Sequence, residues 1–150
     1  MSKLKEYKEK RDFKKTNEPK GGKIKKGEKN FVIHDHFAKK AGHHHDLRLQ
    51  VDGVLRSWAV PKGVPTEKGK KVLAVETEDH PLGYFNFKGE IPEGEYGAGK
   101  VDIFDKGEYN SLEIGEKKIT VELEGDKVKG EYALIRFKKA GDKHWLLFKK

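Results

Sequence analysis

Short runs of alternating apolar and polar residues, separated by turns rich in glycine and proline, fill the sequence from Phe31 to its end. The runs are FVIHDHF, HDLRLQV, VLRSWAV, KVLAVET, KVDIF, KKITVELEG, VKGEYALIRFK and HWLLFKK. Their two-residue period is that of half-buried β-strands, and pieces such as VDGV, PKGVP, EDHPLG, IPEGEYGAG, FDKGEYN and EGDKVKG are turn signals. Many short strands of this kind favour an antiparallel barrel or sandwich. We predict an all-β fold with few short helices, a closed antiparallel β-barrel, because closure removes exposed strand edges.

The first 30 residues differ from the rest in charge. The chain carries a net charge of +8, and residues 1–30 account for +7 of it. This segment has few apolar residues, so burial cannot offset the entropy lost when it becomes ordered. We therefore expect a flexible basic N-terminal arm over residues 1–30, with LKEYKEKRDFKK as a possible short helix, and a β-barrel domain over residues 31–150. The arm is either a solubilising tail or a segment that binds a polyanion, and counterion release from phosphates favours the second.

Composition excludes several classes of protein. The chain has no cysteine, which excludes a disulfide framework and a thiolate metal site. No apolar run approaches the ~20 residues that a membrane-spanning helix needs. The first residues also lack the apolar stretch of a secretory signal. We expect a cytoplasmic protein with no membrane partner, and 150 residues suffice for one domain with a substantial core.

The stretch HHHDLRLQV, residues 43–51, combines three histidines with an aspartate and an arginine. Alternate residues of a strand share a face. One face therefore carries an apolar row, formed by His45, Leu47, Leu49 and Val51. The opposite face carries His44, Asp46, Arg48 and Gln50. Neighbours on one face lie about 6.5 to 7 Å apart along the strand, so His44 and Asp46 can converge on one ion while Arg48 reaches past it.

The run FVIHDHF offers further ligands. Val32, His34 and His36 share one face of this predicted strand, and Phe31, Ile33 and Asp35 share the other. If the two strands are neighbours, either His34 or His36 meets His44 and Asp46. Two imidazoles and one carboxylate suit manganese, iron or zinc and leave coordination positions open for chemistry. The alternative is a row of solvated polar residues, but five of the seven histidines lie within residues 34–45, which favours a metal or phosphate site.

A second polar cluster lies in TEDHPLGY, residues 77–84. His80 precedes a proline, which biases its backbone toward an extended conformation. Beside a metal, His80 and Tyr84 could donate hydrogen bonds to a phosphate, and Arg48 could hold it with its planar fork. Lys62, in WAVPKGVP, is a further candidate phosphate contact. The glycines of IPEGEYGAG predict a hairpin loop rather than a P-loop, because no GK[ST] follows them.

Four of these motifs, HHHDLRL, LRSWAVPKG, EDHPLGY and IPEGEYGAGKVDIFDKG, together resemble the 3′-phosphoesterase domain of bacterial DNA ligase D and its free-standing archaeal relatives. The resemblance runs from YKEKRDFKKTNEP to HWLLFKK, almost the whole chain. It implies a β-barrel and a manganese-dependent hydrolase that acts on DNA 3′ ends. Such an enzyme removes a terminal ribonucleoside to leave a 3′-phosphate, and then removes that phosphate to leave a 3′-hydroxyl. A separate DNA ligase and polymerase are the partners that this activity implies.

The same resemblance implies roles for individual residues. The metal ligands are His36, His44 and Asp46, with His34 as the rival for His36. The residues at the scissile phosphate are His80, Arg48, Tyr84 and Glu78. The substrate contacts are Lys62, Lys71, Arg11, Asp12 and Glu18, of which the last three match positions linked to removal of the ribonucleoside.

This chain departs from the bacterial pattern at two places. The turn between His36 and His44 is longer, which is why His34 stays a rival ligand. Val72 stands where bacterial members often place arginine, and the neighbouring Lys71 is a point charge rather than a bidentate fork. The second departure bears on the ribonucleoside-removing step.

Two other classes of function fit parts of the sequence. The His44-x-Asp46 pair with a distal histidine is also the pattern of a non-haem iron oxygenase. A non-catalytic nucleic-acid-binding module would use the basic arm and leave the histidines incidental. Arg48 beside the predicted ligands favours phosphate chemistry over both alternatives.

Overall fold

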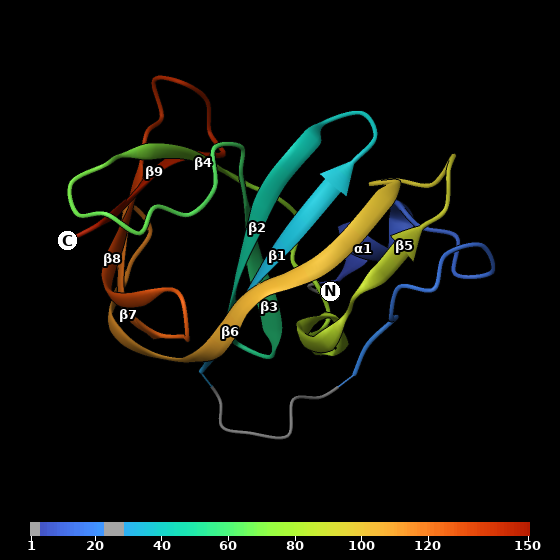
Figure 1. Cartoon of the computed structure of the whole chain (residues 1–150), viewed down its shortest axis with the longest axis horizontal. Coiled ribbons are helices and arrows are strands. Elements are labelled where there is room, and N and C mark those ends of the chain that lie inside the picture. Colours follow the sequence, from blue (N-terminus) through green and yellow to red (C-terminus); the bar gives the residue numbers. More distant parts are fainter. Residues whose placement is uncertain (1–3, 23–28) are drawn as a thin grey trace.

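The computed structural model describes residues 4–22 and 29–150, and its main body is a closed antiparallel β-barrel of eight strands (Figure 1). The barrel strands are β1 (Asn30–Ala38), β2 (Gly42–Val51), β3 (Val54–Val60), β4 (Val72–Glu76), β6 (Gly99–Ile114), β7 (Lys118–Glu124), β8 (Lys129–Arg136) and β9 (His144–Lys149). Their order is β1-β2-β3-β4-β9-β8-β7-β6, and β6 pairs back onto β1 to close the ring. The predicted fold class is confirmed.

Three short elements lie outside this ring: α1 (Lys5–Glu9), the 3₁₀-helix η1 (Leu82–Asn86) and β5 (Gly89–Ile91). Strand β5 pairs with the beginning of β6, so IPEGEYGAG connects two antiparallel strands as the predicted hairpin loop. The described residues include no helix with the length and apolar character to cross a membrane.

Strand β6 corrects one turn assignment. FDKGEYN was expected to be a turn, but residues 104–110 lie inside this long strand. The strand pairs with β1 through Glu108 and then with β7 from Glu108 onward. At Gly107 an added Cβ would lie 2.3 Å from the carbonyl oxygen of Glu124. The glycine therefore marks close approach of two backbones where the barrel wall curves, and not a reversal of the chain.

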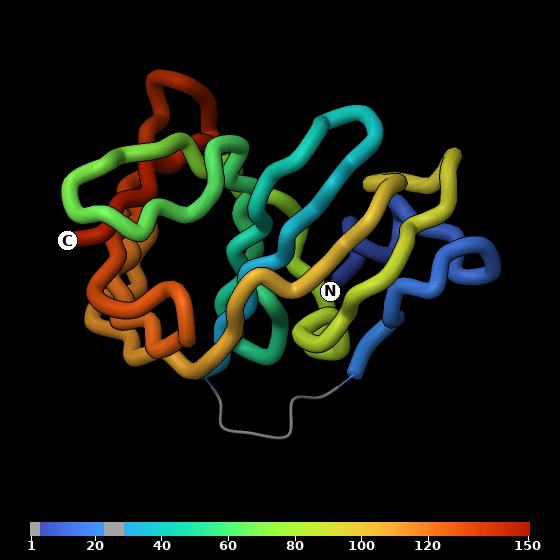
Figure 2. Tube along the Cα trace, in the orientation of Figure 1, coloured from blue at the N-terminus to red at the C-terminus, as the bar shows by residue number. Residues whose placement is uncertain are grey.

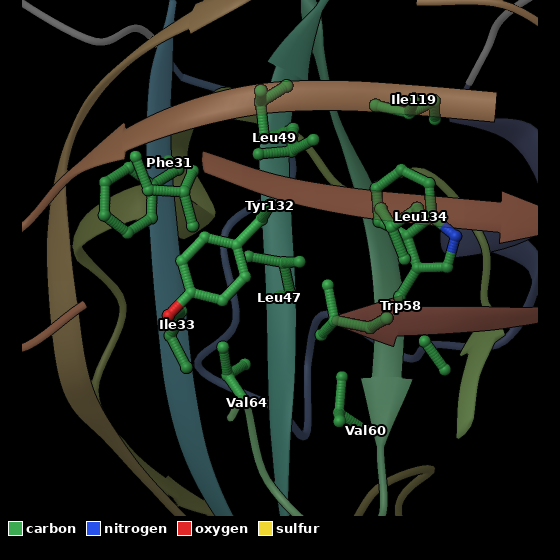
Figure 3. Close-up of a cluster of buried hydrophobic side chains, with 14 of the residues drawn as sticks. Phe31, Ile33, Leu47, Leu49, Trp58, Val60, Val64, Ile119, Tyr132 and Leu134 are labelled. Carbon is green, nitrogen blue, oxygen red and sulfur yellow. The ribbon is translucent and has the colours of Figure 1, made fainter. Parts of the chain in front are cut away.

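The interior of the barrel holds the larger hydrophobic core. Figure 3 shows Phe31 and Ile33 of β1 beside Leu47 and Leu49 of β2, and all four are buried in one cluster with side chains from β3, β7 and β8. These are the residues that strand alternation placed on the apolar faces. Their polar neighbours in sequence therefore lie on the outer wall of the barrel.

A second hydrophobic core lies on that outer wall. It consists of Tyr7, Leu55, Tyr84, Phe87, Ile91 and Val101. These side chains join α1, η1 and β5 to β3 and β6, and Figure 2 shows the N-terminal segment beside the hairpin of β5 and β6. The structure thus has a barrel and a covering layer, with polar residues between them.

The N-terminal segment belongs to this covering layer. The sequence predicted a flexible arm over residues 1–30, whereas residues 4–22 lie against the barrel. Tyr7 is fully buried and donates a hydrogen bond to the carbonyl oxygen of Pro19. Residues 1–3 and 23–28, the remainder of the predicted arm, lie outside the described residues. The mobility of the arm and a domain boundary at residue 31 stay predictions.

A buried carboxylate fastens the turn between β7 and β8 to β6. Asp105 accepts backbone N–H hydrogen bonds from Lys106, Asp126, Lys127 and Val128, at 2.8 to 3.0 Å. Burial alone would raise the pKa of Asp105, but these hydrogen bonds to the charged form outweigh it and lower the pKa. The carboxylate thus closes this end of the barrel in its ionised form.

We predict that Asp105→Asn lowers the free energy of unfolding by about 2 to 4 kcal/mol, because its amide NH₂ cannot accept the bonds that one carboxylate oxygen accepts. The folded-state pKa lies below the unfolded value of about 3.9. The stabilisation is therefore present above about pH 4 and is lost as the pH falls through the folded-state pKa. Urea unfolding of both proteins between pH 3 and 7 measures this, with the exposed Asp126→Asn as control. A difference that does not change with pH would contradict it.

Candidate metal and phosphate site

A cavity of about 780 Å³ opens between the outer wall of the barrel and the covering layer. Its floor comes from β1, β2 and β3, and its walls come from the N-terminal segment and the loops after β1 and β5. The polar side chains that line the floor and inner walls include Arg11, His36, His44, Asp46, Arg48, Glu78, His80 and Tyr84. The volume is in the range of about 300 to 1,000 Å³ that is usual for small-ligand sites.

The antiparallel pairing of β1 and β2 brings the predicted metal ligands together. His36 lies directly opposite His44 in the register. Nδ1 of His36 is 3.3 Å from Oδ2 of Asp46, and Nε2 of His44 is 3.2 Å from Oδ1. The three residues present ligand atoms within 4.8 Å of one another. The geometry therefore places His36, rather than His34, beside His44 and Asp46.

The outward-facing nitrogens of both imidazoles lie beside carbonyl oxygens. Nε2 of His36 is 2.7 Å from the oxygen of Gly97, and Nδ1 of His44 is 3.2 Å from the oxygen of Gly42. A nitrogen beside a carbonyl oxygen must carry the proton, so the neutral rings direct lone pairs at Asp46. Two lone pairs and a carboxylate require a cation between them. Ring N–H groups donating to backbone carbonyls are also the usual partners of metal-bound histidine.

The pKa shifts reflect the same demand for a cation. Burial alone would raise the pKa of Asp46, but His36, His44 and the charge of Arg48 together lower it well below its usual value. Burial lowers the pKa of His44, yet contact with Asp46 outweighs this and raises it. When no metal is bound, a proton on an imidazole therefore fills the place of the cation.

His34 has a different environment. The ring is fully buried, with Nε2 2.9 Å from the oxygen of Phe87, and Nδ1 accepts a hydrogen bond of 3.1 Å from Nε of Arg48. Burial, together with the charge of Arg48, lowers the pKa of His34 to about 3. Both ring nitrogens are engaged, so His34 orients the guanidinium and has no lone pair left for a metal.

Arg48 is held in place from several sides. Nη1 donates to Oγ of Ser57 at 2.9 Å, and Nη2 lies 3.5 Å from Oδ2 of Asp46. The guanidinium also lies over the ring of Tyr84, 4.8 Å from its centroid. A nearly buried cation in a fixed orientation beside the carboxylate is suited to bind an anion that enters the cavity.

His80 extends from an isolated bridge in which its backbone pairs with Leu55, as the following proline predicted. Nδ1 lies 2.9 Å from the carbonyl oxygen of Glu78 and therefore carries the proton. Nε2 lies 3.5 Å from Nη2 of Arg11. Burial, with the charges of Arg48 and Arg11, holds the pKa of His80 well below its usual value. The imidazole is neutral, and its lone pair faces the cationic side of the cavity.

The N-terminal segment supplies one wall through a buried ion-pair network. Arg11 donates to Oε2 of Glu18 at 3.0 Å and lies 3.4 Å from Oε1 of Glu78. The hydroxyl of Tyr84 donates to Oε2 of Glu18 at 2.6 Å. Burial and Glu18 together raise the pKa of Tyr84 well above its usual value. Lys10 completes the network through Glu78, at 2.9 Å.

Three predicted substrate contacts lie elsewhere. Lys62 and Lys71 are exposed and do not line the cavity, and Nζ of Lys71 lies 5.3 Å from the centroid of the Phe148 ring. Asp12 is also exposed, and its carboxylate accepts a hydrogen bond from the backbone N–H of Lys14. Their roles in substrate binding stay predictions.

Sequence reasoning missed three supporting residues: Lys10, Ser57 and Gly97. Their importance arises from contacts across the fold, with Glu78, Arg48 and His36 respectively. Of the three, only Gly97 belonged to a motif noted in the sequence, the glycine-rich loop IPEGEYGAG. The sequence did not indicate that this loop lies beside His36.

A second set of possible ligands, Asp35, His43 and His45, lies on the opposite face of the same two strands. Here Nδ1 of His45 accepts a hydrogen bond of 2.9 Å from the backbone N–H of Val64. The proton of neutral His45 is therefore on Nε2, which lies 3.0 Å from Oδ1 of Asp35 and donates to it. This set satisfies itself with hydrogen bonds and needs no cation.

A β-barrel that gathers two imidazoles, a carboxylate and a buried guanidinium in one cavity has the features of a metal-assisted phosphoester hydrolase. The family model of the DNA Ligase D 3′-phosphoesterase domain matches residues 34–136. The chain belongs to this family and is a phosphoesterase. This membership favours phosphate chemistry over the oxygenase and the non-catalytic binding module.

Curated relatives agree with this assignment. The chain is 41% identical over 155 residues to the multifunctional non-homologous end joining protein LigD of Pseudomonas aeruginosa, covering 97% of this chain and 18% of that protein. It is 47% identical over 139 residues to the multifunctional non-homologous end joining DNA repair protein LigD of Mycobacterium tuberculosis, with 89% and 18% covered. The Mycolicibacterium smegmatis protein is 45% identical, with 96% and 20% covered. The chain thus spans about a fifth of the length of these relatives.

We predict that Tyr7→Ala releases the N-terminal wall of the cavity while the barrel stays folded. Removing a fully buried aromatic ring lowers stability by about 3 to 5 kcal/mol. Local unfolding of residues 4–22 requires less free energy than unfolding of the barrel, so the loss should appear there first. Trypsin should then cut within residues 8–15 at least about 10-fold faster. Phe137→Ala, an exposed aromatic residue on the far side of the barrel, is the control. Unchanged cleavage in Tyr7→Ala would show that the segment is held by other contacts.

Proposed function

We propose that this protein is a metal-dependent phosphoesterase that repairs DNA 3′ ends. It removes a terminal ribonucleoside as a phosphodiesterase and then the remaining 3′-phosphate as a phosphomonoesterase, leaving a 3′-hydroxyl. The observation that carries the proposal is the convergence of His36, His44 and Asp46 beside the fixed guanidinium of Arg48. An anion and a divalent cation are complementary to the two halves of this arrangement.

His36, His44 and Asp46 would hold the cation, and Mn²⁺ is the ion that we propose. Imidazole and carboxylate ligands suit manganese, and the ligand atoms of the three residues lie within 4.8 Å of one another. When bound, the ion supplies positive charge that polarises a phosphate oxygen and favours deprotonation of water. The protein contributes the remaining charge and the orientation of the substrate.

Arg48, His80, Tyr84 and Glu78 would surround the phosphate on the other side, with Tyr84 and Glu78 acting through their contacts with Glu18 and Arg11. Arg48 presents a planar fork that can donate to two phosphate oxygens. His80 is neutral with its proton on Nδ1, so its Nε2 is suited to accept a hydrogen bond from water or substrate. Glu78 and Glu18 hold Arg11 in the wall, where it adds a second guanidinium.

Water is the nucleophile that the described cavity favours. The chain has no cysteine, and no serine is among the described residues that line the cavity. Direct attack of water on phosphorus needs a phosphate held in a fixed orientation and positive charge that stabilises the negative charge developing on its oxygens in the transition state. The guanidinium of Arg48, with a bound cation beside it, would meet both needs.

The biological setting is part of the proposal. The relatives are named for non-homologous end joining, so we propose that this chain prepares 3′ ends on primer–template DNA during such repair. A separate DNA ligase and polymerase would then use the 3′-hydroxyl. The cytoplasmic location expected from the sequence remains a prediction that fits a DNA substrate.

We predict that Asp46→Asn weakens Mn²⁺ binding by more than about 100-fold, since even the outer hydrogen-bond partners of metal ligands are worth about 10- to 100-fold. Asp35→Asn is a matched control, because Asp35 has two histidine neighbours on the other face of the same strands. Titration calorimetry should show one Mn²⁺ per chain for the wild type and for Asp35→Asn. Loss of binding in Asp35→Asn alone would move the metal to the other face.

We predict that the wild-type protein with Mn²⁺ converts a labelled primer–template ending in one ribonucleotide to a 3′-phosphate and then to a 3′-hydroxyl. Asp46→Ala should slow both steps by more than about 100-fold, because it removes a shared ligand. Gel electrophoresis separates the three ends. A primer that stays intact, or an Asp46→Ala protein with full activity, would refute the proposed function.

A further inference from the structure

The loop between β5 and β6, residues 92–98, forms part of the rim of the cavity. Two turns fix its shape, with Glu95 N–H donating to the oxygen of Pro92 and Ala98 N–H to the oxygen of Glu95, both at 3.1 Å. The carbonyl oxygen of Gly97 faces Nε2 of His36. Gly97 has a φ of +76°, and an added Cβ would lie 3.4 Å from the His36 ring. The loop is therefore tied directly to the candidate metal site.

Tyr96 projects from this loop as a half-exposed aromatic side chain. Its exposed fraction is 48%, although it lines a cavity whose other aromatic residue, Tyr84, is buried. Nζ of Lys10 and the guanidinium of Arg11 lie 4.8 and 5.4 Å from the ring centroid. Both cations also contact Glu78 in the wall. These contacts hold the ring at the rim and leave aromatic surface available.

The charges of the cavity differ between its two sides. The floor and the inner wall carry the guanidinium groups of Arg48 and Arg11, which suit a phosphate. On the rim, Glu93 and Glu95 of residues 92–98 are accompanied by Lys39 and Lys40 of the loop after β1, and Glu93 lies 3.7 Å from Nζ of Lys39, so these charges offset one another. The carboxylates can also accept hydrogen bonds from hydroxyl groups. This side of the cavity is therefore complementary to an uncharged nucleoside.

We propose that Tyr96 stacks on the base of the terminal nucleoside that leaves in the first reaction step. A cavity of about 780 Å³ holds a group of nucleotide size, whereas duplex DNA must remain outside. Aromatic side chains bind bases of any sequence by stacking. This inference rests on the proposed function and adds to it a binding site for the leaving group.

The two reaction steps differ in their need for this site. In the first step water adds to phosphorus, the bond from phosphorus to the 5′ oxygen breaks, and the nucleoside leaves with a proton on that oxygen. In the second step the bond to the 3′ oxygen of the primer breaks, and inorganic phosphate leaves. The leaving nucleoside is already gone in the second step, so Tyr96 acts on the first step alone.

The experiment compares Tyr96→Ala and Tyr96→Phe on two primers, one ending in a ribonucleotide and one ending in a 3′-phosphate. Tyr96→Ala should lower kcat/KM about 10-fold on the first primer, chiefly through KM, because a stacked base is lost. Its activity on the 3′-phosphate primer should equal that of the wild type. Tyr96→Phe keeps the ring and should match the wild type on both. Equal loss on both primers, or no loss on either, would overturn the proposal.

A second measurement does not depend on turnover. A primer whose terminal ribonucleotide carries the fluorescent base 2-aminopurine is bound in the presence of EDTA. Stacking on Tyr96 should quench the fluorescence in the wild type and in Tyr96→Phe, and Tyr96→Ala should bind without the quenching. Quenching that is the same in Tyr96→Ala would overturn the proposal. The two measurements can also separate the two proposals. If quenching requires the Tyr96 ring but the wild-type protein with Mn²⁺ hydrolyses neither primer, the base site is supported and the proposed function is refuted.

Discussion

The antiparallel pairing of β1 with β2 is the constraint on which the rest of the structure depends. Because side chains alternate between the two faces, the same pairing fills the barrel with Leu47 and Leu49 and places Asp46 and Arg48 on its outer wall. A shift of one residue in this register would exchange the two faces and expose the core. The register that stabilises the fold is therefore also the register that sets His36 opposite His44.

Strand alternation could be read from the sequence, and it correctly predicted the two faces of β1 and β2. It could not choose between His34 and His36, because both share one face. That choice follows from tertiary contacts, since Phe87 and Arg48 occupy the two nitrogens of His34. The turn expected at FDKGEYN failed for a similar reason. Gly107 is required by the approach of a neighbouring strand, which local sequence does not reveal.

Composition describes only part of the N-terminal segment. Its charge predicted a flexible arm over residues 1–30, which stays a prediction, whereas the structure adds that Tyr7 packs in the outer core and joins residues 4–22 to the barrel. Arg11 then lies between Glu18 and Glu78, with most of its guanidinium charge compensated. In the proposed function, a substrate phosphate would compete with these carboxylates for a guanidinium whose orientation they already fix. Average composition cannot predict such an arrangement, because it depends on a few buried residues.

The two faces of the β1–β2 hairpin each carry a set of two histidines and one aspartate, and the two sets have opposite chemistry. Each face joins two histidines to one aspartate, but hydrogen bonds made by the far side of each ring decide which nitrogen holds the proton. At His45 a backbone N–H of Val64 forces the proton toward Asp35, and the charges are satisfied. At His36 the carbonyl of Gly97 draws the proton away, so a lone pair faces Asp46. The difference between the two sets thus resides in the backbone groups around the side chains, and counting histidines and aspartates does not detect it.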